Sequence, residues 1–74
     1  MLFELHTVRM PDGSADYTFS YPHCEITVYA DAELSKQALM ELAHDMEEFA
    51  SQNGLVIVNA IVDRDGVCTS CSGI

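Results

Sequence analysis

The chain has 74 residues, 49% of them hydrophobic and 20% charged, so it is long enough for one domain and too apolar for a highly charged disordered chain. Twelve acidic residues oppose three basic ones, Arg9, Lys36 and Arg64, which gives a formal net charge of -9. This balance disfavours direct binding to nucleic acid, because phosphate contacts need clustered lysine and arginine side chains. The same charge favours a basic protein as partner.

The N-terminal residues predict a strand and a hairpin turn. Residues 2–10 are rich in apolar and β-forming side chains, although their alternation is imperfect. The next four residues, Pro11-Asp12-Gly13-Ser14, combine a proline of fixed φ with a glycine that has access to positive φ. A second strand is therefore expected to follow at once and to pair with the first.

Two more strands are predicted between the turn and residue 30. Residues 16–21 alternate cleanly, with three aromatic side chains on one face, Tyr17, Phe19 and Tyr21. After a break at Pro22-His23, residues 24–30 resume the alternation with one wet face. We expect the aromatic face to pack under a helix rather than to form an interface or a base-stacking platform.

Residues 32–53 carry the strongest periodicity in the chain. Their apolar side chains fall within about half the circumference of a helix, at 100° per residue. They are Leu34, Ala38, Leu39, Leu42, Ala43, Met46, Phe49 and Ala50. The pattern predicts one long amphipathic helix, which Asn53-Gly54 would end in a left-handed conformation.

Two residues are candidates for the cap at the start of this helix. Asp31 and Ser35 both carry a side-chain oxygen that can accept a hydrogen bond from a free backbone N–H. A cap at Ser35 would also place Leu34 and Leu39 in the positions of a hydrophobic staple. The sequence leaves both alternatives open.

The C-terminal residues predict one buried strand and a weaker one. Residues 55–62 are almost continuously apolar and β-branched, which is typical of a strand covered on both sides or in the middle of a sheet. We expect this segment to be the most buried in the protein. A turn at residues 63–66 would lead to residues 67–74, a short edge strand with a flexible tail.

These elements predict a single α+β domain over residues 1–74. Its order is β-β-β-α-β(-β), with one long amphipathic helix packed on a mostly antiparallel sheet of four to five strands. The third and fourth strands would be parallel, because a helix connects them. One helix can cover only one face, so the other is expected to be partly exposed or used in a dimer. Nothing suggests a membrane span or a signal peptide, and we expect a cytoplasmic protein.

The polar side of the helix is the leading candidate for a binding surface. Glu41, Asp45 and Glu48 recur at i, i+4 and i+7, Glu47 lies beside them, and no lysine or arginine follows Lys36 in the helix. Like charges at this spacing repel by a few tenths of a kcal/mol, and acids near a helix C-terminus oppose its dipole. We expect these four acids to contact a basic partner, with a merely solubilising face as the alternative.

Three cysteines form a second candidate site. Cys68-x-x-Cys71 has the spacing of two zinc ligands, and Cys24 with His23 or His6 would complete a tetrahedral set. Only half of a zinc signature is present, and adjacent residues of a strand point to opposite faces. We therefore expect reduced thiols and no cofactor, with bound zinc as the alternative. A redox role for Cys68 and Cys71 is less strongly indicated, because such motifs need a helix N-terminus or a cation to lower the pKa of a thiol, and the sequence predicts neither near residue 68.

No motif indicates catalysis. Glu41-x-x-His44 matches the i, i+3 ligand pair of di-iron bundles, but those sites draw ligands from four helices. The chain has no nucleophile elbow, P-loop, HExxH or dinucleotide-binding fingerprint. A sheet with one helix is not expected to enclose a sizeable substrate pocket. We therefore expect a protein that is not an enzyme.

The charge pattern predicts a non-enzymatic protein-binding module that inhibits its partner by occupying the partner's basic nucleic-acid-binding surface. In size, charge and compactness, though in no motif, the chain is similar to the acidic inhibitors of phages and mobile elements, including DNA mimics and anti-CRISPR proteins. Two alternatives remain. One is a small zinc-stabilised regulatory protein that uses Cys24, Cys68 and Cys71, and the other is a dimeric structural or assembly subunit.

Overall fold

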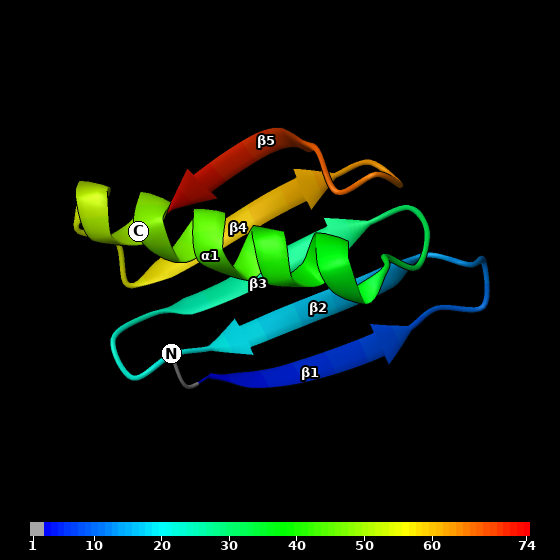
Figure 1. Cartoon of the computed structure of the whole chain (residues 1–74), viewed down its shortest axis with the longest axis horizontal. Helices are drawn as coiled ribbons and strands as arrows, with labels where there is room; N and C mark the ends of the chain where they lie inside the picture. Colours follow the sequence, from blue (N-terminus) through cyan, green and yellow to red (C-terminus); the bar gives the residue numbers. More distant parts are fainter. Residues whose placement is uncertain (1–2) are drawn as a thin grey trace.

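The computed structural model describes residues 3–74 as one helix packed on a five-stranded sheet (Figure 1). In chain order the elements are β1 Glu4–Arg9, β2 Ala15–Ser20, β3 Glu25–Ala30, α1 Lys36–Asn53, β4 Ile57–Val62 and β5 Cys68–Gly73. This is the α+β order predicted from the sequence, with the fifth strand present. Residue 2, where the sequence places the start of the first strand, lies outside the described residues.

The sheet follows the order of the strands along the chain, β1-β2-β3-β4-β5. All neighbouring strands pair antiparallel except β3 and β4, which are parallel. In that parallel pair Ile26 lies opposite Val58, and Val28 lies opposite Ala60. The prediction of a parallel third and fourth strand is confirmed, because α1 carries the chain back across the sheet before β4 begins.

Both ends of α1 show the expected capping chemistry. Ser35 is the N-cap, and its Oγ accepts a hydrogen bond from the Ala38 N–H at 3.1 Å. Gly54 ends the helix with a φ of 64°, and its N–H donates to the Ala50 carbonyl. Leu34 is buried and Leu39 packs against the core, as a cap at Ser35 predicts. The helix therefore begins at residue 36 rather than 32.

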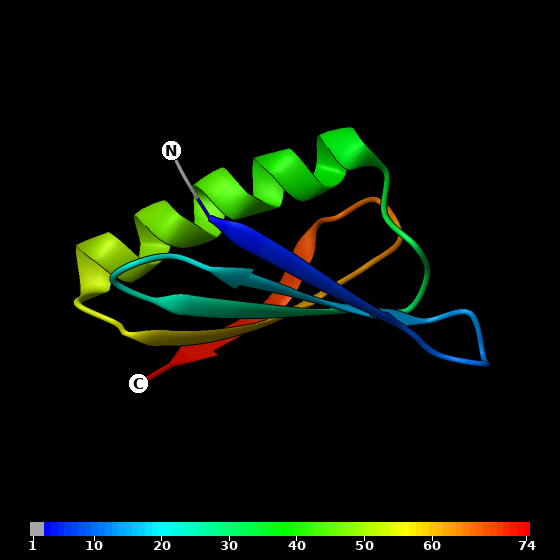
Figure 2. The ribbon, with the colours of Figure 1, turned by 90° about the horizontal axis from the view of Figure 1, so that it is seen from below.

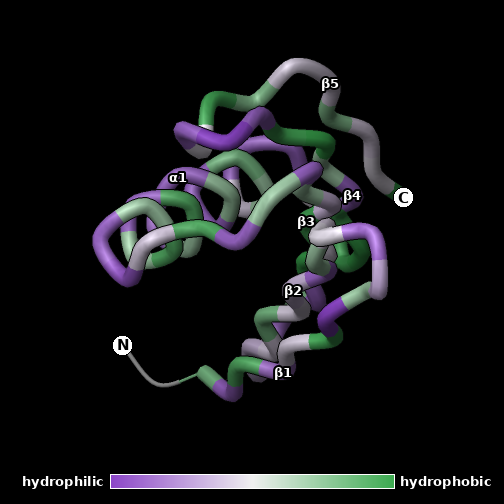
Figure 3. The backbone as a smooth tube through the Cα atoms, turned by 90° about the vertical axis from the view of Figure 1, so that its right-hand side faces the viewer, coloured by the Kyte–Doolittle hydropathy of each residue, from purple (hydrophilic) through white to green (hydrophobic). Residues whose placement is uncertain are grey.

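The helix lies across one face of the curved sheet, on its concave side (Figures 2 and 3). Beneath it, the aromatic residues of β2 and the residue after it are buried, namely Tyr17, Phe19 and Tyr21. The Tyr17 Oη accepts a hydrogen bond from the Leu34 N–H at 3.0 Å, and the Tyr21 Oη donates to the Ala43 carbonyl at 2.8 Å. Burial raises the pKa of Tyr21, with a smaller contribution from the Glu47 carboxylate. The aromatic stripe packs under the helix, as predicted.

No element of the described residues, 3–74, covers the other face of the sheet (Figure 2). In β4, Val58 and Ala60 are fully buried under the helix, whereas Ile57 and Ile61 are 43% and 52% exposed. β4 lies inside the sheet, between β3 and β5, which confirms one of the two predicted alternatives, whereas the other, cover on both sides, is not observed. The expectation that this segment is the most buried is wrong, because β2 is more evenly buried. The reason is that residues 3–74 contain a single helix, which covers one face of the sheet, so an interior strand is still exposed to solvent on its other face.

β5 is longer than predicted. It runs from Cys68 to Gly73, and the Ile74 N–H donates to the Ile57 carbonyl at 2.9 Å. The segment is an edge strand, as expected, but its last residues continue the sheet instead of forming a flexible tail. No helix within residues 3–74 is long and apolar enough to cross a membrane.

Candidate functional site

The helix places three of the four predicted binding residues on one exposed stripe. Glu41, Asp45 and Glu48 are all exposed, on the side of α1 opposite the buried Ala43 and Ala50. A separation of three or four residues brings side chains to the same face of a helix, so the three carboxylates are neighbours. We call Glu41, Asp45 and Glu48 the acidic stripe.

Glu47 does not belong to the acidic stripe. Its side chain is only 15% exposed and turns toward the connection between β2 and β3, where its Oε2 lies 3.0 Å from His23 Nε2. The same oxygen accepts a hydrogen bond from the Ser51 Oγ at 3.0 Å. One residue turns a helix by 100°, which moves Glu47 from the solvent face to its flank. The sequence pattern places Glu47 with the other three acids because it is close to them in the chain, whereas in the structure its side chain lies apart from theirs.

The acidic stripe has little compensating charge around it. The last turn of α1 contains no basic residue. Among residues 3–74, the basic side chain that pairs with the stripe is His44, whose Nε2 lies 3.7 Å from Glu48 Oε2. The Arg9 guanidinium is engaged elsewhere, with its Nε 2.8 Å from Glu33 Oε1. The stripe is therefore a concentrated source of negative potential.

Acids of the turns contribute to this field in different ways. The Asp12 Oδ1 accepts hydrogen bonds from the Oγ and N–H of Ser14, which lower the pKa of Asp12. The Asp63 Oδ1 accepts from the N–H groups of Asp65 and Val67. These two carboxylates organise their own turns. Asp65 is exposed and lines a groove together with Glu41 and Asp45 of the helix.

We expect Asp45→Lys to stabilise the protein. The change replaces the repulsion between Asp45 and its neighbours Glu41 and Glu48 by attraction between a lysine and these two acids. Lysine also has a higher helix propensity than aspartate. The free energy of unfolding should rise by about 0.5–1.5 kcal/mol. Urea denaturation at low salt, followed by circular dichroism, measures this change. Asp45→Asn only removes the repulsion, so its free energy of unfolding should lie between those of the wild type and Asp45→Lys. An unchanged or lower urea midpoint in Asp45→Lys would show that repulsion within the stripe does not destabilise the protein.

The three cysteines do not come together. Glu25, the residue after Cys24, pairs with the first residue of β4, whereas Cys68 pairs with Val62, the last. Five residues of strand, or about 16 Å, separate these positions. Within the part of the chain that the structure describes, no three His, Cys, Asp or Glu side chains are placed to hold a metal ion. The geometry thus gives no support to a zinc site built from Cys24, Cys68 and Cys71 with His23 or His6.

Cys68 and Cys71 form a disulfide, in contrast to the expected reduced pair. A register shift in β5 explains their proximity. Cys68 lies opposite Val62 and Cys71 lies opposite Ala60, although three residues of a regular strand would place them on opposite faces. One extra residue, Thr69, resets the alternation, and its Oγ1 donates to the Ile61 carbonyl at 3.0 Å.

Cys24 is a buried free thiol near Glu47. Burial raises the pKa of Cys24, and the Glu47 carboxylate adds to the effect. A nucleophilic cysteine needs the opposite shift, because the thiolate is the reactive form. Cys24 therefore acts as a small core residue, and its neighbours His23 and Glu47 do not form an activated pair with it.

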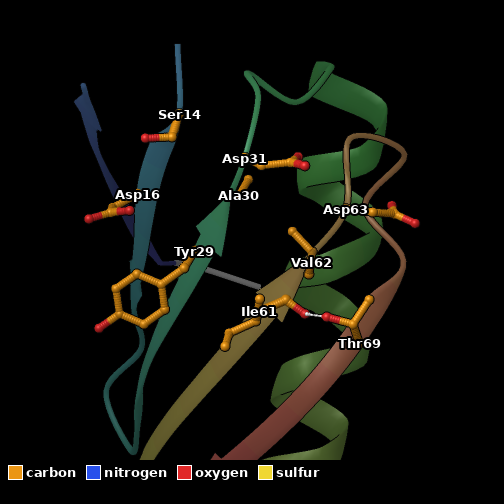
Figure 4. A pocket seen from close by; sticks show the side chains of 9 residues that line it. All are labelled: Ser14, Asp16, Tyr29, Ala30, Asp31, Ile61, Val62, Asp63 and Thr69. Carbon is orange, nitrogen blue, oxygen red and sulfur yellow. Dashed lines mark hydrogen bonds between the residues drawn. The ribbon is translucent and has the colours of Figure 1, made fainter. Parts of the chain in front are cut away.

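A hollow lies at the end of the sheet where the parallel strands β3 and β4 finish (Figure 4). It has a volume of about 390 Å³, and its lining includes Asp16, Tyr29, Asp31, Ile61 and Asp63. Figure 4 shows that Asp16 and Asp63 point in opposite directions, so the carboxylates do not converge on one point. Polar groups that fail to converge do not fix the orientation of a small ligand.

The bare face of the sheet contains exposed apolar side chains between polar ones. Tyr29 of β3 lies opposite Ile61 of β4, and Val8 of β1 extends this row beyond Asp16. His6, the other candidate metal ligand, is exposed on β1, with its Nε2 3.6 Å from Glu4 Oε2. Dimerisation through this face stays a prediction.

No protein-family model, curated protein or solved structure matches the chain.

Proposed function

We propose that this protein is a non-enzymatic inhibitor whose acidic helix face occupies the basic nucleic-acid-binding surface of a partner protein. The observation that supports the proposal is the acidic stripe itself. Glu41, Asp45 and Glu48 stand exposed on one regular helix, and no lysine or arginine of the helix lies among them. The stripe presents a line of negative charge on a rigid support.

The spacing of the stripe suits competition with nucleic acid. Successive carboxylates are separated along the helix axis by four and three residues, or about 6 and 4.5 Å. Phosphates follow each other along one strand of a duplex with a rise of about 3.4 Å. The stripe and a phosphate backbone thus carry charge at linear densities of the same order, although not in register, and a basic groove that binds the stripe would exclude nucleic acid.

The mechanism is electrostatic and steric. Complementary potentials speed the association of the two proteins, and salt screens the attraction. Binding requires no bond to be made or broken in the partner. Such a complex is expected to form quickly at low salt, to dissociate at moderate salt and to compete directly with DNA or RNA.

The test is affinity capture from a nuclease-treated lysate, so that bound nucleic acid cannot bridge the two proteins. Glu41→Lys/Asp45→Lys/Glu48→Lys is compared with the wild type after circular dichroism has shown that both are folded. Captured proteins are identified by mass spectrometry. Wild type alone should retain a nucleic-acid-binding protein, and an added oligonucleotide should release it. The triple variant should bind the identified partner at least about tenfold more weakly.

A matched control separates the position of the charge from its amount. Glu4→Lys/Glu25→Lys/Asp31→Lys reverses three exposed acids that lie outside the helix, with the same change in net charge. This variant should keep most of the affinity. Equal losses in both variants would mean that only net charge matters, and capture that resists the oligonucleotide would contradict the proposed inhibition.

A further inference from the structure

A groove runs beside the acidic stripe, between α1 and the turn that connects β4 to β5. Figure 2 shows this turn, in orange, rising from the sheet toward the helix. The groove has a volume of about 320 Å³. The helix wall consists of Ala38, Glu41, Leu42, Asp45 and Met46, and the turn wall of Asp65, Gly66, Val67 and Cys68.

The turn wall is held in place by its own hydrogen bonds and by contact with the helix. The Asp63 Oδ1 accepts from two N–H groups of the turn, and the Gly66 N–H donates to the Asp63 carbonyl at 3.0 Å. Gly66 has a φ of 81°, and a Cβ at this position would lie 3.2 Å from Ala38 Cβ. The turn thus reaches the helix closely at Gly66, and this contact sets the position of the turn wall.

The groove has a mixed polar and apolar lining, with carboxylates at its rim. The apolar part comes mainly from Val67 of the turn wall, which is 59% exposed, while Leu42 and Met46 of the helix wall contribute only their small exposed edges. The rim carries exposed carboxylates from both walls, Glu41 and Asp45 from the helix and Asp65 from the turn. No lysine, arginine or histidine is among the residues that line the groove.

We propose that this groove receives one lysine or arginine side chain of the basic partner, an inference that rests on the proposed function. These side chains combine a long aliphatic stem with a charged end, and they bury the stem while keeping the charge at the surface. The stem would lie on Leu42, Met46 and Val67. The cationic group would lie between the rim carboxylates, which come from two different elements and approach it from both sides.

Other occupants fit the groove less well. A neutral apolar side chain would bring the three carboxylates of the rim closer to a low-dielectric surface without compensating their charge. An anionic side chain would be repelled. The volume is at the lower end of the range for small-molecule sites, which suits a single side chain better than a strand or helix of the partner.

The probe for the test is Nα-acetyl-lysine methylamide, titrated into the ¹⁵N-labelled full chain and followed by NMR. Saturating shifts are expected for the amides of Leu42, Met46, Asp65, Gly66 and Val67, and not for those of the bare sheet face. Two analogues separate the contributions of stem and charge. The norleucine analogue keeps the stem without the charge, the diaminopropionic acid analogue keeps the charge without the stem, and both should bind more weakly than the lysine probe.

A matched pair of variants locates the binding site. Asp65→Asn removes one rim charge and should weaken binding of the lysine probe by about two- to fivefold. Asp12→Asn removes the same charge from the hairpin turn between β1 and β2 and should leave binding unchanged. Equal binding of the lysine and norleucine analogues, or shifts spread evenly over all acidic residues, would overturn the inference.

The outcome is separable from that of the proposed function. One outcome is that the wild type captures a nucleic-acid-binding protein that the triple variant does not capture, while the lysine probe causes no saturating shifts. In that case the acidic stripe acts without the groove. If the probe binds the groove and no nucleic-acid-binding protein is captured, the groove inference stands and the proposed inhibition fails.

Discussion

Phe19→Ala should lower the free energy of unfolding by about 3–5 kcal/mol, because it removes the largest fully buried side chain of the core. Phe19 is the fifth of the six residues of β2 and has no exposed surface. It also meets Phe3 edge to face, with the ring centroids 5.6 Å apart. The truncation leaves a cavity and removes one of the two aromatic neighbours of Phe3, the other being Tyr21. Urea denaturation followed by circular dichroism is the measurement.

The expected loss is large for a domain of this size. Stabilities of about 0.05–0.15 kcal/mol per residue are typical, so a 3–5 kcal/mol change can unfold a substantial fraction of the molecules. Tyr29→Ala is the matched control, since it truncates an aromatic residue of the adjacent strand on the bare face of the sheet. It should cost less than about 1.5 kcal/mol. A comparable loss in both variants would contradict the one-sided core.

Val58→Asn should also destabilise the protein severely, by about 3–5 kcal/mol. Val58 is fully buried, opposite Ile26 of β3 and under the helix. The substitution forfeits the burial of the valine and places an amide where the surrounding side chains are apolar. Thermal and urea denaturation should both show the loss.

Ile61→Asn is the control for this prediction, on the same strand but on the bare face. Because Ile61 is already half exposed, the change should cost no more than about 1 kcal/mol, the range of strand propensity. A severe loss in Ile61→Asn would show instead that the bare face is covered in solution, and light scattering would then be expected to report an oligomer.

The mixed outcome for the candidate sites has a simple geometric reason. Helical periodicity is regular enough to place Glu41, Asp45 and Glu48 on one stripe without a structure. The same periodicity should have moved Glu47 to the flank, and its partner His23 comes from a connection 24 residues away in the sequence. Contacts between distant segments depend on the packing of the elements, which sequence periodicity does not describe.

The groove was not visible in the sequence for the same reason. Its two walls come from α1 and from the turn after β4, and only the close approach of Gly66 to Ala38 brings them together. The sequence did contain one local signal, the turn residues Asp-Arg-Asp-Gly followed by a valine. That signal predicts a turn, but it does not say which element the turn faces.

Local chemistry was enough to determine the order of the elements, the Ser35 and Gly54 caps as candidates, the buried aromatic face of β2 and the parallel return of β4. These features depend on side-chain periodicity, turn residues and the short link between strand and helix. Tertiary structure decided which face of β4 is covered, where β5 ends and how far apart the cysteines lie. An apolar run such as residues 57–62 is compatible with burial on one face or both, and only the number of layers that the rest of the chain supplies can decide between them.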